Sequence, residues 1–171
     1  MRDMLVLTVI GADRKGLVQR LAEQISAVGG NWEESRMARL AGQFAGILRI
    51  TVDTDRTDEL LAALRGLDAA GLEVTAQKTT APATEPAAVA IRVELTANDR
   101  PGIIRDVSRI LAERGLNVEE LETEVKDAPM GGAPLFTARA EVRAPAGFQL
   151  HELRTQLEAL GGELMVDLST E

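Results

Sequence analysis

The stretch G-A-D-R-K-G-L-V (11–18) recurs as A-N-D-R-P-G-I-I (97–104), at a constant spacing of 86 residues. Both copies contain Asp-Arg-x-Gly followed by two aliphatic residues. More positions match at the same spacing: Leu5, Leu7 and Val9 with Ile91, Val93 and Leu95, and Gly29, Asn31, Glu33 and Glu34 with Gly115, Asn117, Glu119 and Glu120. Self-similarity at a fixed period predicts two structural units of the same kind.

The chain length fits this division. Its 171 residues accommodate two small domains of about 80 residues each. Between the two copies lies T-T-A-P-A-T-E-P-A-A (79–88), which has two prolines, small polar residues and no hydrophobic period. These properties indicate a linker. We therefore predict a first domain over 1–79, a linker over 80–87 and a second domain over 88–171.

Hydrophobic periodicity predicts the same order of elements in each unit. Apolar residues spaced by two indicate strands, and apolar residues spaced by three or four indicate amphipathic helices. In the first unit the predicted elements are a strand at 4–10, a helix at 17–28, a strand from Asn31, a strand at 44–52, a helix at 57–69 and a strand at 72–76. In the second they are 89–96, 103–114, a strand from Asn117, 136–142, 149–160 and 164–168.

This order, β-α-β-β-α-β repeated twice, predicts an α+β protein made of two ferredoxin-like domains. Each domain has an antiparallel sheet with its helices on one face. We expect the strands that begin at Asn31 and Asn117 to run beside the first strand of their unit. The uncovered sheet face or the sheet edge must stay polar or find a partner, and pairing of the two units is the simplest solution.

Composition excludes several classes of function. Residues 1–81 contain 10 basic and 11 acidic residues, and residues 82–171 contain 9 and 16. This acidic balance and an aromatic content of 2% disfavour direct nucleic-acid binding. The chain has no cysteine, its N-terminus resembles a strand and not a signal peptide, and it contains no run of about 18 apolar residues. We expect a cytoplasmic protein without a membrane segment.

The repeated loop has the chemistry of a small-molecule site. Gly16 and Gly102 remove a side chain where a helix begins, and the first N–H groups of a helix attract carboxylates and phosphates. Asp13 and Asp99 precede these glycines. An aspartate at this position either caps the helix, which is the common role, or meets a ligand ammonium group. A site that offers N–H groups and a carboxylate suits a free amino acid.

Other candidate sites are weaker. His151 is the only histidine and lacks a partner for acid–base catalysis, so a surface role is expected. Glu120, Glu122 and Glu124 share one side of a predicted strand, which favours a solvated face over a weak cation site. The G-G-A-P stretch (131–134) lacks the lysine and length of a phosphate loop. We predict no catalytic residues, no metal and no cofactor.

Tandem β-α-β-β-α-β units with D-R-x-G-[LI]-[VI] after the first strand and G-x-N after the first helix resemble ACT domains, which are small-molecule sensors, mostly of amino acids. The stretch G-G-N-W-E-E-S-R-M-A-R-L-A-G-Q-F (29–44) resembles the glycine cleavage system transcriptional repressor family. The resemblance implies a protein without a DNA-binding domain. It also implies action on a DNA-binding activator, with glycine relieving the interaction.

The resemblance also implies a ligand site at the interface between paired ACT units. Its contacts come from the loop after the first strand and from the Asn that opens the second. Carried over, the ligand-binding residues are Asp13, Arg14, Gly16, Leu17, Asn31, Asn98, Asp99, Arg100, Gly102, Ile103 and Asn117. Lys15 replaces the usual proline, which stands at Pro101 in the second copy, so the two copies need not bind equally.

The main hypothesis is therefore a non-enzymatic regulatory protein that binds a small amino acid, glycine or serine-like, and acts on a protein partner. Its ACT units pair within one chain or across a homodimer. The alternative is a ligand-free protein–protein interaction or dimerisation module. A third class, RNA-recognition modules, shares the order of elements but is opposed by the acidic charge and the scarcity of aromatic residues.

Overall fold

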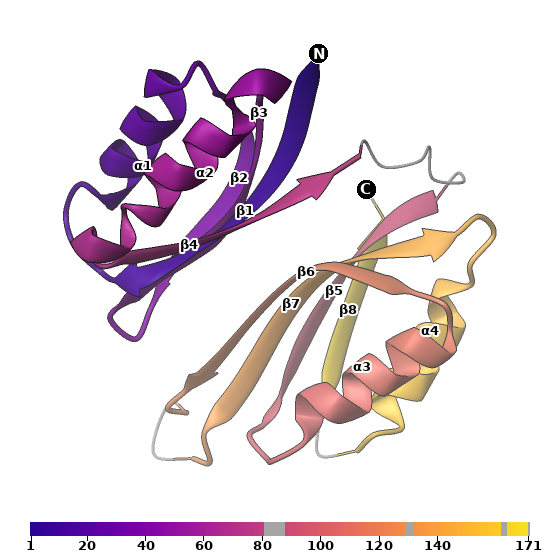
Figure 1. The fold of residues 1–171 in the computed structure, drawn as a ribbon. Coiled ribbons are helices and arrows are strands. Elements are labelled where there is room, and N and C mark those ends of the chain that lie inside the picture. The colour runs from indigo at the N-terminus through magenta and orange to yellow at the C-terminus, as the bar shows by residue number, and fades with distance from the viewer. Residues whose placement is uncertain (81–87, 129–131, 162–163, 171) are drawn as a thin grey trace. The chain divides into compact units, whose positions relative to one another are not determined.

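A computed structural model describes all residues except 81–87, 129–131, 162–163 and 171. It contains two compact units, 1–83 and 84–171, shown in Figure 1. The predicted linker, apart from Thr80, lies outside the described residues. The domain limits 1–79 and 88–171 stay a prediction, and each unit is described below by itself.

Each unit contains the predicted order of elements. The first has β1 (Arg2–Ala12), α1 (Leu17–Ala27), β2 (Asn31–Leu40), β3 (Gln43–Asp53), α2 (Thr57–Arg65) and β4 (Leu72–Thr79). The second has β5 (Ala88–Asn98), α3 (Ile103–Glu113), β6 (Asn117–Lys126), β7 (Leu135–Pro145), α4 (Leu150–Glu158) and β8 (Met165–Thr170). The helix predicted over 57–69 ends early, because a short 3-10 turn, η2 (Asp68–Ala70), leads into β4.

The sheets are antiparallel, with strand order β2-β3-β1-β4 in the first unit and β6-β7-β5-β8 in the second. In both units the two helices cover the same face of the sheet (Figure 1). This confirms the ferredoxin-like α+β fold. The expectation that the Asn31 and Asn117 strands run beside the first strand is wrong, because β3 and β7 lie between them. A tight turn with positive φ at Ala41 and Gly42 instead pairs β2 with β3.

The core of each unit lies between the sheet and its helices. In the first unit, Leu7, Val9 and Ile50 from β1 and β3 are completely buried, and Leu21 of α1 and Leu60 of α2 pack against them. The buried residues of the second unit follow the same plan: Ile91, Val93, Leu95, Val107, Ile110, Leu111, Val142, Leu153 and Leu157. The predicted apolar stripes therefore face inward in both units.

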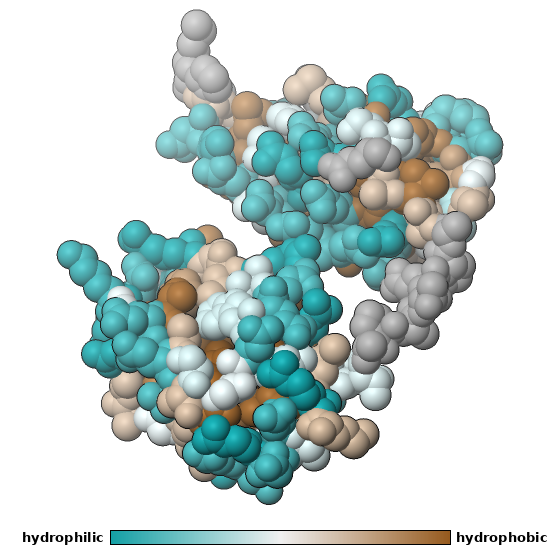
Figure 2. All heavy atoms as spheres, turned by 90° about the horizontal axis from the view of Figure 1, so that it is seen from above, coloured by the Kyte–Doolittle hydropathy of each residue, from teal (hydrophilic) through white to brown (hydrophobic). Residues whose placement is uncertain are grey.

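The helix-free faces of the two sheets differ in chemistry. In the first unit this face exposes Ile10 and Ile47, which are 45% and 50% accessible. In the second, β5 and β7 place opposite charges in register. Arg92 lies 3.7 Å from Glu141, and the Glu94–Arg139 pair lies at 3.1 Å. Over the face seen in Figure 2, hydrophilic side chains dominate both units and apolar ones form small patches.

We expect the two units to lose stability separately. Leu21→Ala removes a completely buried side chain from the first core, and Leu153→Ala does the same in the second. Each substitution should cost about 2–5 kcal/mol in the free energy of unfolding of its own unit. Amide hydrogen exchange measures this, since faster exchange should be confined to the unit that carries the substitution. Equal acceleration in both units would contradict two independent cores.

Candidate functional site

The repeated motif forms the connection between strand and helix in each unit. We call residues 13–16, between β1 and α1, the first loop, and residues 99–102, between β5 and α3, the second loop. Each ends at a glycine in the left-handed region, with φ of 86° at Gly16 and 88° at Gly102. A side chain at either position would strain the backbone, which explains the glycine that both copies of the motif share.

Hydrogen bonds fix each loop to the neighbouring strand connection. The Asp13 N–H donates to the carbonyl oxygen of Gly42 at 2.9 Å, and the Asp99 N–H donates to that of Pro134 at 2.8 Å. The loops therefore lie at the same end of the sheet as the β2–β3 and β6–β7 connections. The first loop is exposed to solvent, whereas the second is exposed at Asp99 and Pro101 and half-buried at Arg100 and Gly102.

Neither aspartate caps a helix. The N-cap residues of α1 and α3 are Gly16 and Gly102, and no side chain among the described residues accepts a hydrogen bond from either first turn. The Asp13 carboxylate instead forms an ion pair with Nε of Arg39 on β2 at 3.0 Å. The capping interpretation is therefore wrong. The first-turn N–H groups keep their capacity to bind an anion.

In the first loop, the side chain of Arg14 lies against the turn that enters β4. A Cβ atom built on Gly71 would lie 3.8 Å from Nη1 of Arg14. Gly11 keeps this end of the sheet tight, since its own Cβ would lie 2.2 Å from the Gly71 carbonyl oxygen. Within the part of the chain that the structure describes, no ion pair of Arg14 or Lys15 is found. The first loop thus presents positive charge to solvent.

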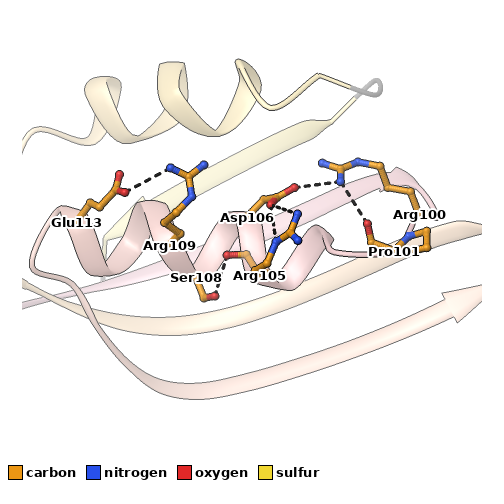
Figure 3. A network of polar contacts seen from close by, with 7 residues as sticks. All are labelled: Arg100, Pro101, Arg105, Asp106, Ser108, Arg109 and Glu113. Carbon is orange, nitrogen blue, oxygen red and sulfur yellow. Dashed lines mark hydrogen bonds and ion pairs between the residues drawn. The ribbon is translucent and has the colours of Figure 1, made fainter.

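In the second loop the motif arginine is paired with a carboxylate, unlike Arg14 in the first loop (Figure 3). Nη1 of Arg100 lies 3.0 Å from Oδ2 of Asp106 on α3, and Arg105 donates to Oδ1 of Asp106 through Nη2 and Nε at 2.9 and 3.1 Å. The Arg105 hydrogen bonds, with those of Arg100, hold the pKa of Asp106 below its usual value. Arg100 is therefore already engaged by a carboxylate.

Differences at two equivalent positions explain why the two loops carry different ion pairs. The first-unit position equivalent to Asp106 is Arg20, so Arg14 has no such carboxylate beside it. The second-unit position equivalent to Arg39 is Val125, which cannot pair with Asp99. Among the described residues, the first loop therefore offers an unpaired guanidinium and the second an unpaired carboxylate.

Sequence reasoning missed Asp106 and Arg39, the partners of the motif side chains. Asp106 could have been found from the sequence, because it is an acidic residue four positions after Gly102 and so lies in the first turn of the helix beside the loop. No local signal pointed to Arg39. It lies on β2, and only the sheet register brings it to Asp13.

The two asparagines lie far from the loops of their own unit. Asn31 pairs with Thr51, which pairs with Met4 near the start of β1, whereas the first loop follows Ala12 at its end. Eight strand residues separate these positions, or roughly 26 Å at 3.3 Å per residue. Asn117 is placed in the same way, since it pairs with Arg143, which pairs with Ala90 near the start of β5. A single unit therefore does not bring its asparagine and its loop together.

The remaining predicted residues lie at the loops but not all point outward. Leu17 and Ile103 are 4% and 5% exposed and belong to the cores, so they can offer a ligand only backbone groups. Asn98 ends β5 and is exposed. It lines an open hollow of about 340 Å³ formed with Thr96, Ala97, Leu135, Leu164 and Met165.

Other features carry no site. None of the described helices has the length and apolar character needed to cross a bilayer. In the described ranges, no three carboxylate or histidine side chains gather closely enough to hold a metal ion. His151 is exposed on α4.

Comparison with known proteins gives the same result for both units. Two models described as "ACT domain" match residues 3–77 and 91–146. The "Glycine cleavage system transcriptional repressor" proteins of Escherichia coli (strain K12) and Shigella flexneri are each 26% identical over 162 residues, covering 94% of this chain and 85% of theirs. The crystal structure of an unknown protein from Galdieria sulphuraria superposes with a TM-score of 0.82 and 27% identity, covering 100% of this chain and 99% of that one.

The lowered pKa of Asp106 predicts a pH-dependent contribution to stability. A carboxyl whose pKa is lower in the folded than in the unfolded state stabilises the fold above the unfolded value of about 3.9, and loses this effect as the pH falls through the folded value. Asp106→Asn should therefore lower the free energy of unfolding at pH 7. The difference from the unsubstituted protein should disappear in strong acid. Urea unfolding across this pH range measures it, and a constant difference would contradict the assignment.

Proposed function

Because the chain belongs to the ACT-domain family and carries two such domains in tandem, we propose that it is a non-enzymatic regulatory protein that senses a small amino acid such as glycine or serine. The observation that carries the proposal is the pair of loops. Each joins a glycine turn to a helix with an uncapped first turn, and the two carry opposite unpaired charges.

These groups match the two ends of an amino acid. The free guanidinium of Arg14, with the first-turn N–H groups of α1, suits a carboxylate. The carboxylate of Asp99 suits an ammonium group. Arg100 contributes less to carboxylate binding, since Asp106 already occupies it. Gly16 and Gly102 have no side chain, so a small amino acid such as glycine or serine can approach the backbone of either loop.

The ligand pocket is proposed to form from two ACT units. A loop and an asparagine of the same unit are roughly 26 Å apart, so any pocket that uses both must combine a loop of one unit with Asn31 or Asn117 of another. The second unit comes from the same chain or from a second copy in a homodimer. A ligand that binds between two units favours the paired state and so transmits its presence.

The partner is proposed to be a regulatory protein. Similarity to the glycine cleavage system transcriptional repressor proteins over 94% of the chain supports a role in the control of transcription. In our proposal the chain exerts this control by contact with a transcriptional activator. The net charge of −8 gives no support to direct contact with nucleic acid. We place this function in the cytoplasm, where glycine metabolism would be sensed.

A thermal-shift screen of the twenty amino acids tests ligand binding. At about 100 times its dissociation constant, a ligand that binds only the folded state stabilises it by ~2.7 kcal/mol, so glycine or serine should raise Tm by several degrees. Arg14→Ala and Asp99→Ala should each weaken binding roughly tenfold or more, because each removes a charged contact. Arg65→Ala, an exposed charge change on α2, is the matched control. Folded protein that responds to no amino acid would overturn the proposal.

Asn31→Ala together with Asn117→Ala tests whether the asparagines complete the pocket. We expect a loss of amino-acid affinity as large as that of Arg14→Ala, because each asparagine contributes an uncharged amide, a group that neither loop contains. Gln77→Ala on β4 is the control for removal of an exposed amide. Isothermal titration calorimetry measures the affinity. Unchanged affinity in the double variant would confine the site to the loops.

Mixing distinguishes the two ways of pairing. A chain with Arg14→Ala is combined with a chain that lacks both asparagines. Recovery of part of the binding shows that loop and asparagine come from different copies, and no recovery shows a pocket within one chain.

A further inference from the structure

The face of the first sheet that lies opposite α1 and α2 carries few charged side chains (Figure 1). The register of β1 with β3 and β4 places alternate residues of each strand on this side. We call this side the first open face. On β1, β3 and β4 it comprises Met4, Val6, Thr8, Ile10, Ala45, Ile47, Arg49, Thr51, Glu73, Thr75 and Gln77.

Apolar side chains occupy the middle of the first open face. Ile10 and Ile47 are large hydrophobic residues, yet they are 45% and 50% accessible. Val6 and Ile47 line a hollow of about 200 Å³ on this face. Leu40 adds an apolar side chain on the same side of β2 and is 79% accessible. Single exposed apolar residues are normal on a protein surface, but a group of them in the middle of a sheet marks an interaction site.

The charged side chains of this face gather along β2, where they pair with one another. Nη1 of Arg36 lies 2.9 Å from Oε1 of Glu34. Nη2 of Arg49 lies 3.5 Å from Oε2 of Glu34, and Nε of Arg49 lies 3.2 Å from Oε2 of Glu33. Glu73 stands on β4, across the apolar middle from this cluster. A partner can therefore cover the middle of the face while these charges stay at its border.

The second unit uses the same side of its sheet in the opposite way. Val6 and Ile47 correspond to Arg92 and Arg139, and both arginines form cross-strand ion pairs with glutamates. The fold therefore tolerates a helix-free face that is charged throughout. The apolar middle of the first open face is a property of the first unit and is not required by the fold.

The helix-free face of the second unit is a poor occupant for the first open face. Its charged residues stand on all four strands: Arg92, Glu94, Glu120, Glu122, Arg139, Glu141 and Asp167. Apolar side chains laid on them would remove ion pairs from water, a cost that the attraction within a pair does not reliably offset. Because these charges cover the whole face, this holds in every alignment of the two surfaces.

A second copy of the first open face fits in both charge and area. The charges along β2 already balance one another, so two copies bring an uncharged middle to an uncharged middle whichever way they are aligned. Four strands about 4.8 Å apart and about 3.3 Å per residue over Met4–Ala12 give a face of roughly 19 by 30 Å. Two such faces bury roughly 1,100 Å², which reaches the lower limit of specific interfaces.

We propose that two copies of the chain pack their first open faces against each other about a two-fold axis. The axis passes near the centre of the face, where Thr8 pairs with Ile47. The sheets lie about 10 Å apart and cross at about 30°, as in aligned β-sandwiches. Ile10 and Ile47 become buried, and the Arg36–Glu34 pair stays at the rim. Neither loop belongs to this interface, so the inference goes beyond amino-acid sensing.

The test uses the full chain without any amino acid, so its failure leaves amino-acid sensing untouched. Sedimentation equilibrium between about 1 and 200 µM should show association of one chain to two with a micromolar Kd. The contact is located by mixing chain labelled at isoleucine methyl groups with unlabelled chain. Intermolecular nuclear Overhauser effects should arise from the methyl groups of Ile10 and Ile47.

A reciprocal pair of variants sharpens the test. Ile47→Arg, which installs the residue type of Arg139, should raise the Kd of the dimer roughly a hundredfold, because the two-fold axis places two such arginines in the apolar middle. Ile47 is half exposed, so the variant should fold, and an unchanged urea midpoint checks this. The matched control is Val125→Arg on β6, which installs the residue type of Arg39 and should change the Kd by less than about twofold.

Three results would overturn the proposal. The first is a chain that stays monomeric at the highest concentration. The second is a dimer whose Kd is the same with Ile47→Arg. The third is a dimer that Val125→Arg weakens and Ile47→Arg does not, which would place the contact at the β6 edge.

Discussion

Covering only one face of a sheet is the constraint from which the rest of this molecule follows. Both helices of each unit pack on the same side, which buries the leucine and valine rows of the central strands and leaves a second face and two edges in contact with water. The two units meet this constraint differently. The first keeps Ile10 and Ile47 exposed on its open face beside the Arg49–Glu34 ion pair. The second carries the Arg92–Glu141 and Glu94–Arg139 pairs on that face and exposes apolar residues at the β6 edge.

The fold was predictable because its information is local and doubled. Apolar residues spaced by two indicate strands, and apolar residues spaced by three or four indicate helices. Because the chain repeats at a spacing of 86 residues, an element predicted in one unit is supported by the same pattern in the other. The left-handed glycines at the ends of α1 and α3, Gly29 and Gly115, also follow from local backbone chemistry. The strand beside the one that begins at Asn31 was misjudged, because the short connection at Ala41 and Gly42 was not recognised as a hairpin turn. This turn pairs β2 with β3.

The candidate site was predictable in its backbone but not in its electrostatics. The glycine turns lie where the motif placed them, because a left-handed residue before a helix is a sequence-encoded feature. The roles of the aspartates were not encoded in the same way. An aspartate before a helix usually caps it, and here the cap position falls three residues later, on the glycine. Asp13 is then held by Arg39, a residue 26 positions away that only the sheet brings near.

The two loops differ in which motif side chain the rest of the unit holds. Arg100 reaches from the second loop to Asp106 in the opening turn of α3, whereas Arg20 stands at that position in the first unit. The Asp13–Arg39 ion pair ties the first loop to β2, whereas Val125 stands in the place of Arg39 in the second unit. Two substitutions between the repeats therefore decide that the aspartate is held in the first loop and the arginine in the second. Among the described residues, Arg14 and Asp99 are the motif side chains that no ion pair holds.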